Sequence, residues 1–341
     1  MRHTPLNIKN NSRCQPYPWH PSVVYSENGW NEHKFWMAQT PFPPINIAPY
    51  PDRFELPCIH YSDDGVNWIP ILTNPIIDLT EEEIEAHNYY SDPHLILRNG
   101  VLELFFRFTF LENKQLIGNK TLLMKMFSED GTHWSNAKIV ADLREPKDIA
   151  IWGGQIISQS LIWRGGMYYC YYVDRSSYLT NRKICLTVSN DGLLWDKYVR
   201  IELQGKYVDP WHIDVQYYDE KYQMVVYDFN NLYWFDSVDG VCFRYVSKII
   251  SPTRFFMDFY GMGLYRACSI KVLDDIYVYF SAKNETKTSI GLLKTRDRHS
   301  FMPINGMSQA KYFCNYIIPQ LSKTNIKRYV KWYMKKWSLT R

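Results

Sequence analysis

Three acidic residues lie in apolar, strand-like surroundings where a carboxyl group is unusual. Asp92 precedes a proline in a Ser-Asp-Pro-His motif, Asp214 follows a Trp-His-Ile run, and Glu55 lies in Phe-Glu-Leu-Pro. Burial raises the pKa of a carboxyl group, so such an acid can donate a proton near neutral pH while a second, ionised carboxylate acts as base. We therefore take Asp92, Asp214 and Glu55 as catalytic candidates. The sequence leaves open which is the acid, which is the base, and which adjusts the pKa and orientation of the other two.

Cationic and aromatic residues accompany these acids and are candidates for binding a substrate. Arginine and histidine suit a carboxylate or phosphate group, and tryptophan stacks on sugar rings. An anionic sugar, a sugar phosphate or a nucleotide sugar is therefore the expected ligand. The competing interpretation is that each histidine is a satisfied buried ring and each arginine a salt bridge between neighbouring elements. The candidates are His20, His94, His212, Arg107, Arg266, Trp19 and Trp211.

The sequence contains no motif that specifies a cofactor or a metal. Neither His-x-x-x-His nor His-Glu-x-x-His occurs, although His20, His212 and Asp214 are in principle a three-ligand set. Glycine-rich phosphate-binding and dinucleotide-binding loops are also missing, which argues against NTPase and nicotinamide chemistry. We therefore expect no cofactor and no metal, and the sequence leaves open whether an ion occupies the channel.

A repeated phrase indicates how the chain positions these residues. Ser62-Asp-Asp-Gly-Val-Asn-Trp68 returns at 128–134 and 189–195, with weaker copies at 237–243 and 295–301. The aspartates at 64, 130, 191, 239 and 297 are 66, 61, 48 and 58 residues apart, which is the size of a four-stranded blade. Aspartate and glycine favour a tight turn, so these Asp boxes are interpreted as structural. The sequence predicts an all-β fold, a five-bladed β-propeller.

In a propeller the first strand of each blade lines the central channel, so the starts of these strands meet at one mouth. The expected first strands begin near residues 19, 91, 156, 211 and 264. Aligning them places one set of residues at equal depth, and a second set two residues later. The first set is His20, Asp92, Ser158, His212 and Ala267, and the second is Ser22, His94, Ser160, Asp214 and Ser269.

Composition narrows the classes of function. No run of 18 apolar residues occurs, and the first residues lack the apolar core of a secretory signal. The seven cysteines show no Cys-x-x-Cys spacing and are interpreted as free thiols, so a cytoplasmic protein is expected. Outside 321–341 the chain carries 32 basic and 35 acidic side chains, which argues against nucleic acid as a partner.

Two helices are expected. Residues 80–87 read as a short capped helix, and 326–337 as a basic amphipathic helix with Ile326, Val330, Tyr333, Met334 and Trp337 on one side. We expect a propeller domain over 1–320 and this C-terminal helix within 321–341. Such a helix can lie on an anionic membrane surface, which suggests a peripheral location at the inner membrane face, or it can pack on the flank of the propeller.

The Ser-Asp-Pro-His motif, the Asp boxes and the five-blade spacing resemble the five-bladed propeller carbohydrate-active enzymes, over about residues 17 to 305. These are glycoside hydrolase families 43 and 32 and the related family 130 phosphorylases. The resemblance implies that Asp92 is the blade-two aspartate that tunes and orients. Where the family pattern has a carboxylate in blade one and a glutamate in blade three, this chain has His20 and Ser158.

We expect an enzyme that acts on a glycosidic bond of an anionic saccharide in surface-polysaccharide metabolism, with hydrolysis as the default. A membrane-associated glycosyltransferase or a phosphorylase acting on a lipid-linked or phosphorylated saccharide is a second hypothesis. A glycan-binding propeller without catalysis is a third, because two expected carboxylates are missing.

Overall fold

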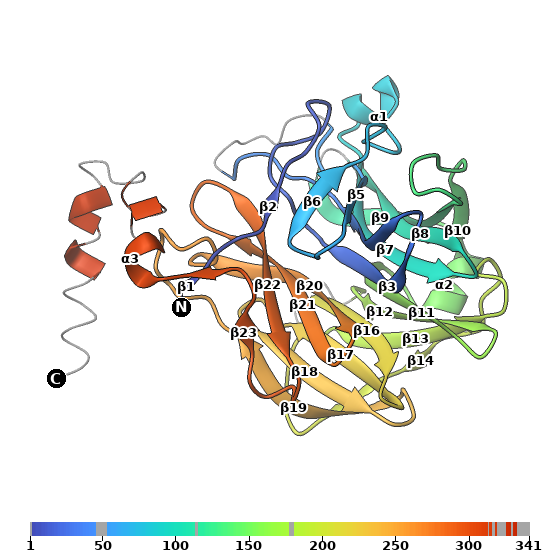
Figure 1. Ribbon diagram of the computed structural model, residues 1–341. Helices are drawn as coiled ribbons and strands as arrows, with labels where there is room; N and C mark the ends of the chain where they lie inside the picture. Colours follow the sequence, from blue (N-terminus) through green and yellow to red (C-terminus); the bar gives the residue numbers. More distant parts are fainter. Residues whose placement is uncertain are drawn as a thin grey trace.

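The computed structural model describes residues 2–45, 53–112, 115–176, 181–312, 314–315, 318, 325–328 and 330–332. Five mainly antiparallel sheets surround a central axis (Figure 1). The innermost strands are β3 (Ser22–Trp30), β7 (Tyr89–Arg98), β11 (Ile156–Arg164), β16 (His212–Tyr218) and β20 (Gly263–Val272). The expected five-bladed propeller is therefore confirmed, and each expected first strand is the inner strand of a blade.

The remaining strands extend each blade outward. Blade one adds β4 (His33–Gln39), β5 (Cys58–Ser62) and β6 (Asn67–Pro70), and blade two adds β8 (Val101–Glu112), β9 (Gln115–Ser128) and β10 (Lys138–Asp142). Blade three adds β12 (Met167–Asp174), β13 (Lys183–Ser189) and β14 (Val199–Arg200). Blade four adds β17 (Lys221–Tyr227), β18 (Leu232–Ser237), β19 (Cys242–Ile250) and the parallel β15 (Glu202–Gln204), and blade five adds β21 (Asp275–Lys283), β22 (Thr288–Thr295) and β23 (Met302–Pro303).

Apolar side chains fill the seams between neighbouring blades. Five buried clusters each join two adjacent sheets, for example Trp36 of blade one with Leu104 of blade two, and Val225 of blade four with Leu264 of blade five. Burial of large apolar area is the main stabilising contribution in such a fold. The seams therefore hold the inner strands in a fixed ring.

The repeated phrase forms the same turn in every blade. In the first copy, Asp64 Oδ1 accepts hydrogen bonds from the backbone N–H groups of Val66 and Asn67, each 2.8 Å long. The last copy keeps this pattern around Asp297, although Arg298 adopts the φ of +63° that glycine adopts elsewhere. The structural interpretation of the repeat agrees with this geometry, because the aspartate carboxylates accept the backbone hydrogen bonds of the turns.

Gly131 provides a test of how these turns pack. Its φ is +79°, and a Cβ atom there would lie 2.3 Å from the Trp36 ring of the neighbouring blade. We expect Gly131→Ala to lower the free energy of unfolding by about 2–4 kcal/mol, from a clash added to backbone strain. Gly100 is the matched control, because its φ is +77° and nothing lies within 4 Å of the added Cβ. Gly100→Ala should cost only about 1 kcal/mol. Equal losses in chemical denaturation would contradict the packing argument.

The N-terminal segment closes the ring. β1 (Arg2–His3) pairs with β24 (Gly306–Met307), and β2 (Asn7–Ile8) pairs in parallel with β6 of blade one. Between them the backbone N–H of Leu6 donates to the carbonyl of Ile290 in blade five. The N-terminal segment is therefore tied to both blade one and blade five.

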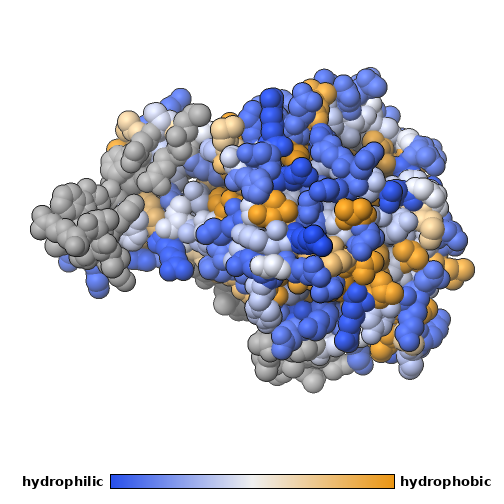
Figure 2. All heavy atoms as spheres, turned by 90° about the horizontal axis from the view of Figure 1, so that it is seen from below, coloured by the Kyte–Doolittle hydropathy of each residue, from blue (hydrophilic) through white to orange (hydrophobic). Residues whose placement is uncertain are grey.

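Short helices lie in the segments between or after the blades. α1 (Glu81–Glu85) has the predicted cap, because Thr80 and Glu83 form a reciprocal capping box. α2 (Pro146–Trp152) was not predicted from the sequence, and α3 (Gln309–Tyr312) follows blade five. No helix among the described residues is long and apolar enough to cross a membrane. On the face shown in Figure 2, apolar side chains lie in small groups among hydrophilic ones.

The described part of the C-terminal helix, residues 325–328 and 330–332, contacts the propeller. The Trp332 ring lies 4.5 Å from that of Phe255, and Arg328 forms an ion pair with Glu285. Ile326 and Val330 remain 47% and 49% exposed. Tyr333, Met334 and Trp337 lie outside the described residues, so membrane contact stays a prediction.

Candidate active site

Breaks in strand pairing point side chains into one mouth of the channel. The pairing register shifts between Ser91 and His94 in β7, and between Ile157 and Ser160 in β11. Asp92 and Ser158, at these bulges, have φ of 51° and 53°, and His20 just before β3 has 53°. A left-handed backbone conformation is energetically costly for residues other than glycine, and such residues are common at functional sites. Bulges at these positions change the direction of a side chain.

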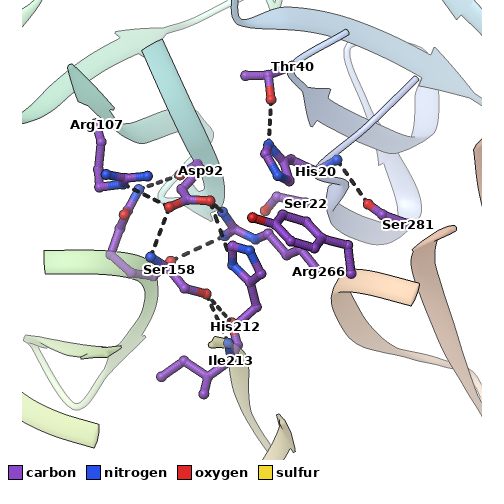
Figure 3. A network of polar contacts seen from close by, with 12 residues as sticks. His20, Ser22, Thr40, Asp92, Arg107, Ser158, His212, Ile213, Arg266 and Ser281 are labelled. Carbon is purple, nitrogen blue, oxygen red and sulfur yellow. Dashed lines mark hydrogen bonds and ion pairs between the residues drawn. The ribbon is translucent and has the colours of Figure 1, made fainter. Parts of the chain in front are cut away.

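Asp92 is the centre of the site (Figure 3). Its Oδ2 accepts hydrogen bonds from Arg107 Nε at 2.7 Å and from the backbone N–H of Ser158 at 2.9 Å. Its Oδ1 lies 3.4 Å from Arg266 Nη1 and 3.7 Å from His212 Nδ1. Four of the five blades therefore converge on one carboxylate.

The charge of Asp92 is set by these neighbours. Burial alone would raise its pKa, but Arg107, His212 and Arg266 hold the pKa of Asp92 well below its ordinary value. The Asp92 side chain is fully buried, and those of Arg107 and Arg266 are almost fully buried. The negative charge of the carboxylate therefore offsets the cost of burying the two guanidinium charges, and they offset the cost of burying it. Asp92 is ionised at neutral pH and is not a candidate proton donor.

His20 and His212 face each other across this carboxylate, with ring centroids 5.6 Å apart. Burial lowers the pKa of His212 to about 3 and that of His20 well below its ordinary value, and Asp92 only partly offsets the effect. Both rings are therefore neutral at physiological pH. Thr40 Oγ1 lies 2.8 Å from His20 Nδ1, which leaves Nε2 of that ring without a hydrogen bond to the described residues.

Glu55 enters the site from the bend before β5, with φ of 57°. Glu55 was predicted to lie within a strand, but β5 begins only at Cys58. Burial raises the pKa of Glu55 to about 8, opposed by a hydrogen bond with Ser91 and by the charge of Arg107. The carboxyl group lies 3.9 Å from His20 Nδ1. The expected raised pKa agrees with this environment, and Glu55 can exchange a proton near neutral pH.

Three of these residues form a possible metal site. One ligand atom each from His20, Asp92 and His212 lies within 4.8 Å of the others. His20 Nε2, Asp92 Oδ1 and both ring nitrogens of His212 are buried and make no hydrogen bond to the described residues. Two neutral imidazoles and one carboxylate are a donor set that Zn²⁺ and similar divalent ions accept. Such an ion would share Asp92 Oδ1 with Arg266, which lies 3.4 Å from that oxygen. The residues therefore fit a divalent cation.

The second set of channel residues forms a structural layer below the site. Ser22 Oγ accepts from the backbone N–H of Leu95 at 2.9 Å, and His94 Nε2 lies 2.9 Å from the carbonyl of Leu161. Asp214 Oδ2 accepts from the backbone N–H of Ser269 at 2.8 Å, and burial raises its pKa to about 6. Each contact joins one blade to the next. A catalytic role for Asp214 and a substrate contact by His94 stay predictions.

Aromatic residues surround the mouth. Trp211 Nε1 donates to the Tyr265 hydroxyl at 2.8 Å, and the Tyr265 ring stacks on those of Trp19 and His20. Phe229, 50% exposed, lies 5.0 Å from Trp211. This wall can stack against a sugar ring.

The structure thus brings together eight of the ten predicted site residues: Asp92, Glu55, His20, His212, Arg107, Arg266, Trp19 and Trp211. In blade five it is Arg266, one residue before the aligned Ala267, that reaches Asp92, because the strand bulges between Leu264 and Ala267. Thr40, Ser158 and Tyr265 were missed in these roles. The sequence around these three residues contains no pattern that predicts a bulge.

Solved structures of carbohydrate-active enzymes share the fold of this chain. The crystal structure of an N-acetylgalactosamine deacetylase from F. plautii, in complex with blood group B trisaccharide, superposes with a TM-score of 0.68 at 17% identity, covering 86% of this chain and 93% of that one. A β-xylosidase/α-arabinofuranosidase from a compost microbial metagenome, in complex with xylotriose, has a TM-score of 0.59 at 12% identity, covering 89% and 98%. The resemblance is one of fold. The predicted similarity to five-bladed propeller carbohydrate enzymes is confirmed at that level.

A relative found by sequence comparison is also an N-acetylgalactosamine deacetylase from the same organism as the first of these structures. The A type blood N-acetyl-α-D-galactosamine deacetylase of Flavonifractor plautii is 24% identical over 252 residues, which are 62% of this chain. The matched region spans only 31% of the length of that relative. No protein-family model matches the chain.

Proposed function

We propose that this protein is a carbohydrate-active enzyme that hydrolyses the amide of an N-acetylated amino sugar, with a divalent metal held by His20, Asp92 and His212. The observation that carries the proposal is this cluster of buried ligand atoms that make no hydrogen bond to the described residues, at the mouth of a propeller shared with a deacetylase. It departs from the expectation of no metal, which was based on motif spacing. Ligands drawn from three blades have no fixed spacing in sequence.

The surrounding residues supply the remaining parts of an amide hydrolysis. A bound divalent ion supplies Lewis acidity and lowers the pKa of water. Arg107 and the Ser158 backbone hold Oδ2 of Asp92, which orients Oδ1 toward the histidines. Burial raises the pKa of Glu55 to about 8, so a minor, ionised fraction is present near neutral pH. In that form Glu55 can take a proton from the attacking water, and the resulting carboxyl group can then deliver it to the departing amine.

Glycoside hydrolysis is the second candidate, because Asp92 and Glu55 supply an ionised carboxylate and a protonated carboxyl group. These are the two states that a glycosidase needs. An anionic substrate is less well supported, because Arg107 and Arg266 already pair with Asp92. The surface-polysaccharide role stays a prediction.

Mass spectrometry of the products distinguishes these reactions. We expect an oligosaccharide that carries N-acetylgalactosamine or N-acetylglucosamine, incubated with Zn²⁺-loaded protein, to lose its acetyl group while the glycan chain stays intact. The His212→Ala variant is the inactive control. A shortened glycan with its acetyl groups retained would overturn deacetylation in favour of glycosidic cleavage. Product formed only with phosphate or a nucleotide sugar would overturn both, and binding without any product would indicate a non-catalytic propeller.

A further inference from the structure

Two thiols lie against each other at the ends of the segment that carries His20, Thr40 and Glu55. Cys14 Sγ and Cys58 Sγ are 3.0 Å apart, and both residues are free cysteines. Cys58 is fully buried at the start of β5, whereas Cys14 is partly exposed in the N-terminal segment. A sulfur–sulfur bond is about 2.0 Å long, so the two atoms need to approach by only about 1 Å.

Hydrogen bonds on both sides hold this arrangement. The backbone N–H of Cys14 donates to the carbonyl of Asn11 at 2.9 Å, and Asn11 Nδ2 donates to the carbonyl of Ile71 at 2.8 Å. Cys58 is paired with Gln39 of β4, and the Gln39 amide donates to Asn10 Oδ1 at 2.6 Å. The thiols are therefore brought together by the fold.

The pair differs from the other cysteines that the structure describes. Cys170, Cys185 and Cys268 are buried in the seams, Cys242 lies beside Glu202, and Cys314 is exposed. Within the described ranges, no second pair of thiols is in contact.

We propose that Cys14 and Cys58 are a modification site that forms a reversible disulfide by exchange with a low-molecular-weight disulfide such as oxidised glutathione. The Cys14 thiolate attacks one glutathione sulfur, which releases one reduced glutathione and leaves a mixed disulfide. The Cys58 thiolate then attacks Cys14 Sγ and displaces the second reduced glutathione. Both protein thiols are oxidised, each loses its proton, and the oxidised glutathione takes up the two electrons.

The geometry assigns the order of these steps. Cys14 is the accessible partner, and the hydrogen bond from Cys58 lowers the pKa of Cys14, which favours its thiolate. Burial raises the pKa of Cys58, so it reacts only with the sulfur already next to it. The cross-link closes the loop from 14 to 58, which carries His20, Thr40 and Glu55. Oxidation would therefore cross-link the segment that supplies His20, Thr40 and Glu55 to the site, whatever reaction the site performs.

Peptide mapping of the whole chain tests this inference. Wild-type protein treated with oxidised glutathione and digested with trypsin without reduction should give peptide 14–34 linked to peptide 54–98. Treatment with dithiothreitol should separate them. From loop-entropy arguments we expect the oxidised protein to unfold about 5 °C higher than the reduced protein.

Three variants control the experiment. Cys58→Ser should stop at a glutathione adduct on Cys14, Cys14→Ser should not react at Cys58, and Cys268→Ser should still form the link. Linkage of Cys14 or Cys58 to another cysteine, or a persistent glutathione adduct on wild-type Cys14, would overturn the proposal. Recovery of both thiols unmodified would also overturn it.

Discussion

Asp92→Asn is expected to lower the free energy of unfolding at pH 7 by about 3–5 kcal/mol and to abolish turnover. The substitution preserves the shape of the side chain but removes the charge that compensates Arg107 and Arg266, both almost fully buried. It also removes one of the three proposed metal ligands. Chemical denaturation of the metal-free variant separates the loss of stability from the loss of metal.

The pH dependence of this difference has a definite sign. The folded-state pKa of Asp92 lies well below its unfolded value of about 3.8, so its stabilisation is fully present above that pH. It declines as the pH falls further, because protonation then favours the unfolded chain. The wild type and Asp92→Asn should therefore differ most near neutrality and converge in acid.

Asp275→Asn is the matched control, since Asp275 pairs with an arginine, Arg296, that is 73% exposed. An exposed ion pair contributes at most about 1 kcal/mol. If Asp92→Asn cost no more than Asp275→Asn, the central carboxylate would not be holding the arginines as described.

Replacing either histidine of the proposed metal site should remove binding of a divalent ion. We expect His20→Ala and His212→Ala each to weaken Zn²⁺ binding by at least about 100-fold, because loss of a supporting residue alone already costs 10- to 100-fold. Titration calorimetry or competition with a chromogenic chelator measures the affinity.

Two further variants make this test specific. His94→Ala removes a buried histidine from the layer below, where it contacts the Leu161 carbonyl, and should leave Zn²⁺ affinity within a few-fold of wild type. Glu55→Gln should also retain the metal but lose turnover, because its proposed role is proton transfer. Equal losses of affinity for His94→Ala and His212→Ala would indicate a general effect on folding.

The propeller could be predicted because its signals are local. Each blade carries its own turn sequence, and alternating apolar strands fix which residues face the channel, so Ser22, His94, Ser160, Asp214 and Ser269 lie in one layer as expected. The site was predicted less completely because bulges break that alternation. Arg266 was predicted as a binding residue, but the alternation placed Ala267, not Arg266, at the depth of Asp92.

The grouping of residues at the site also depends on geometry that no short motif encodes. The sequence suggested His20, His212 and Asp214 as a possible ligand set, whereas the structure groups the two histidines with Asp92. Asp214 is two residues beyond His212 on the same strand and therefore lies one layer deeper, where it bonds the Ser269 backbone. Glu55 reaches the site from a bend, a position that strand periodicity does not describe.

The most direct test of this account is a crystal structure of the Zn²⁺-loaded protein with anomalous scattering recorded at the zinc edge. The account predicts one strong peak bounded by His20, Asp92 and His212, lost in the His212→Ala variant. A peak at another position, or none between these three side chains at saturating Zn²⁺, would contradict it.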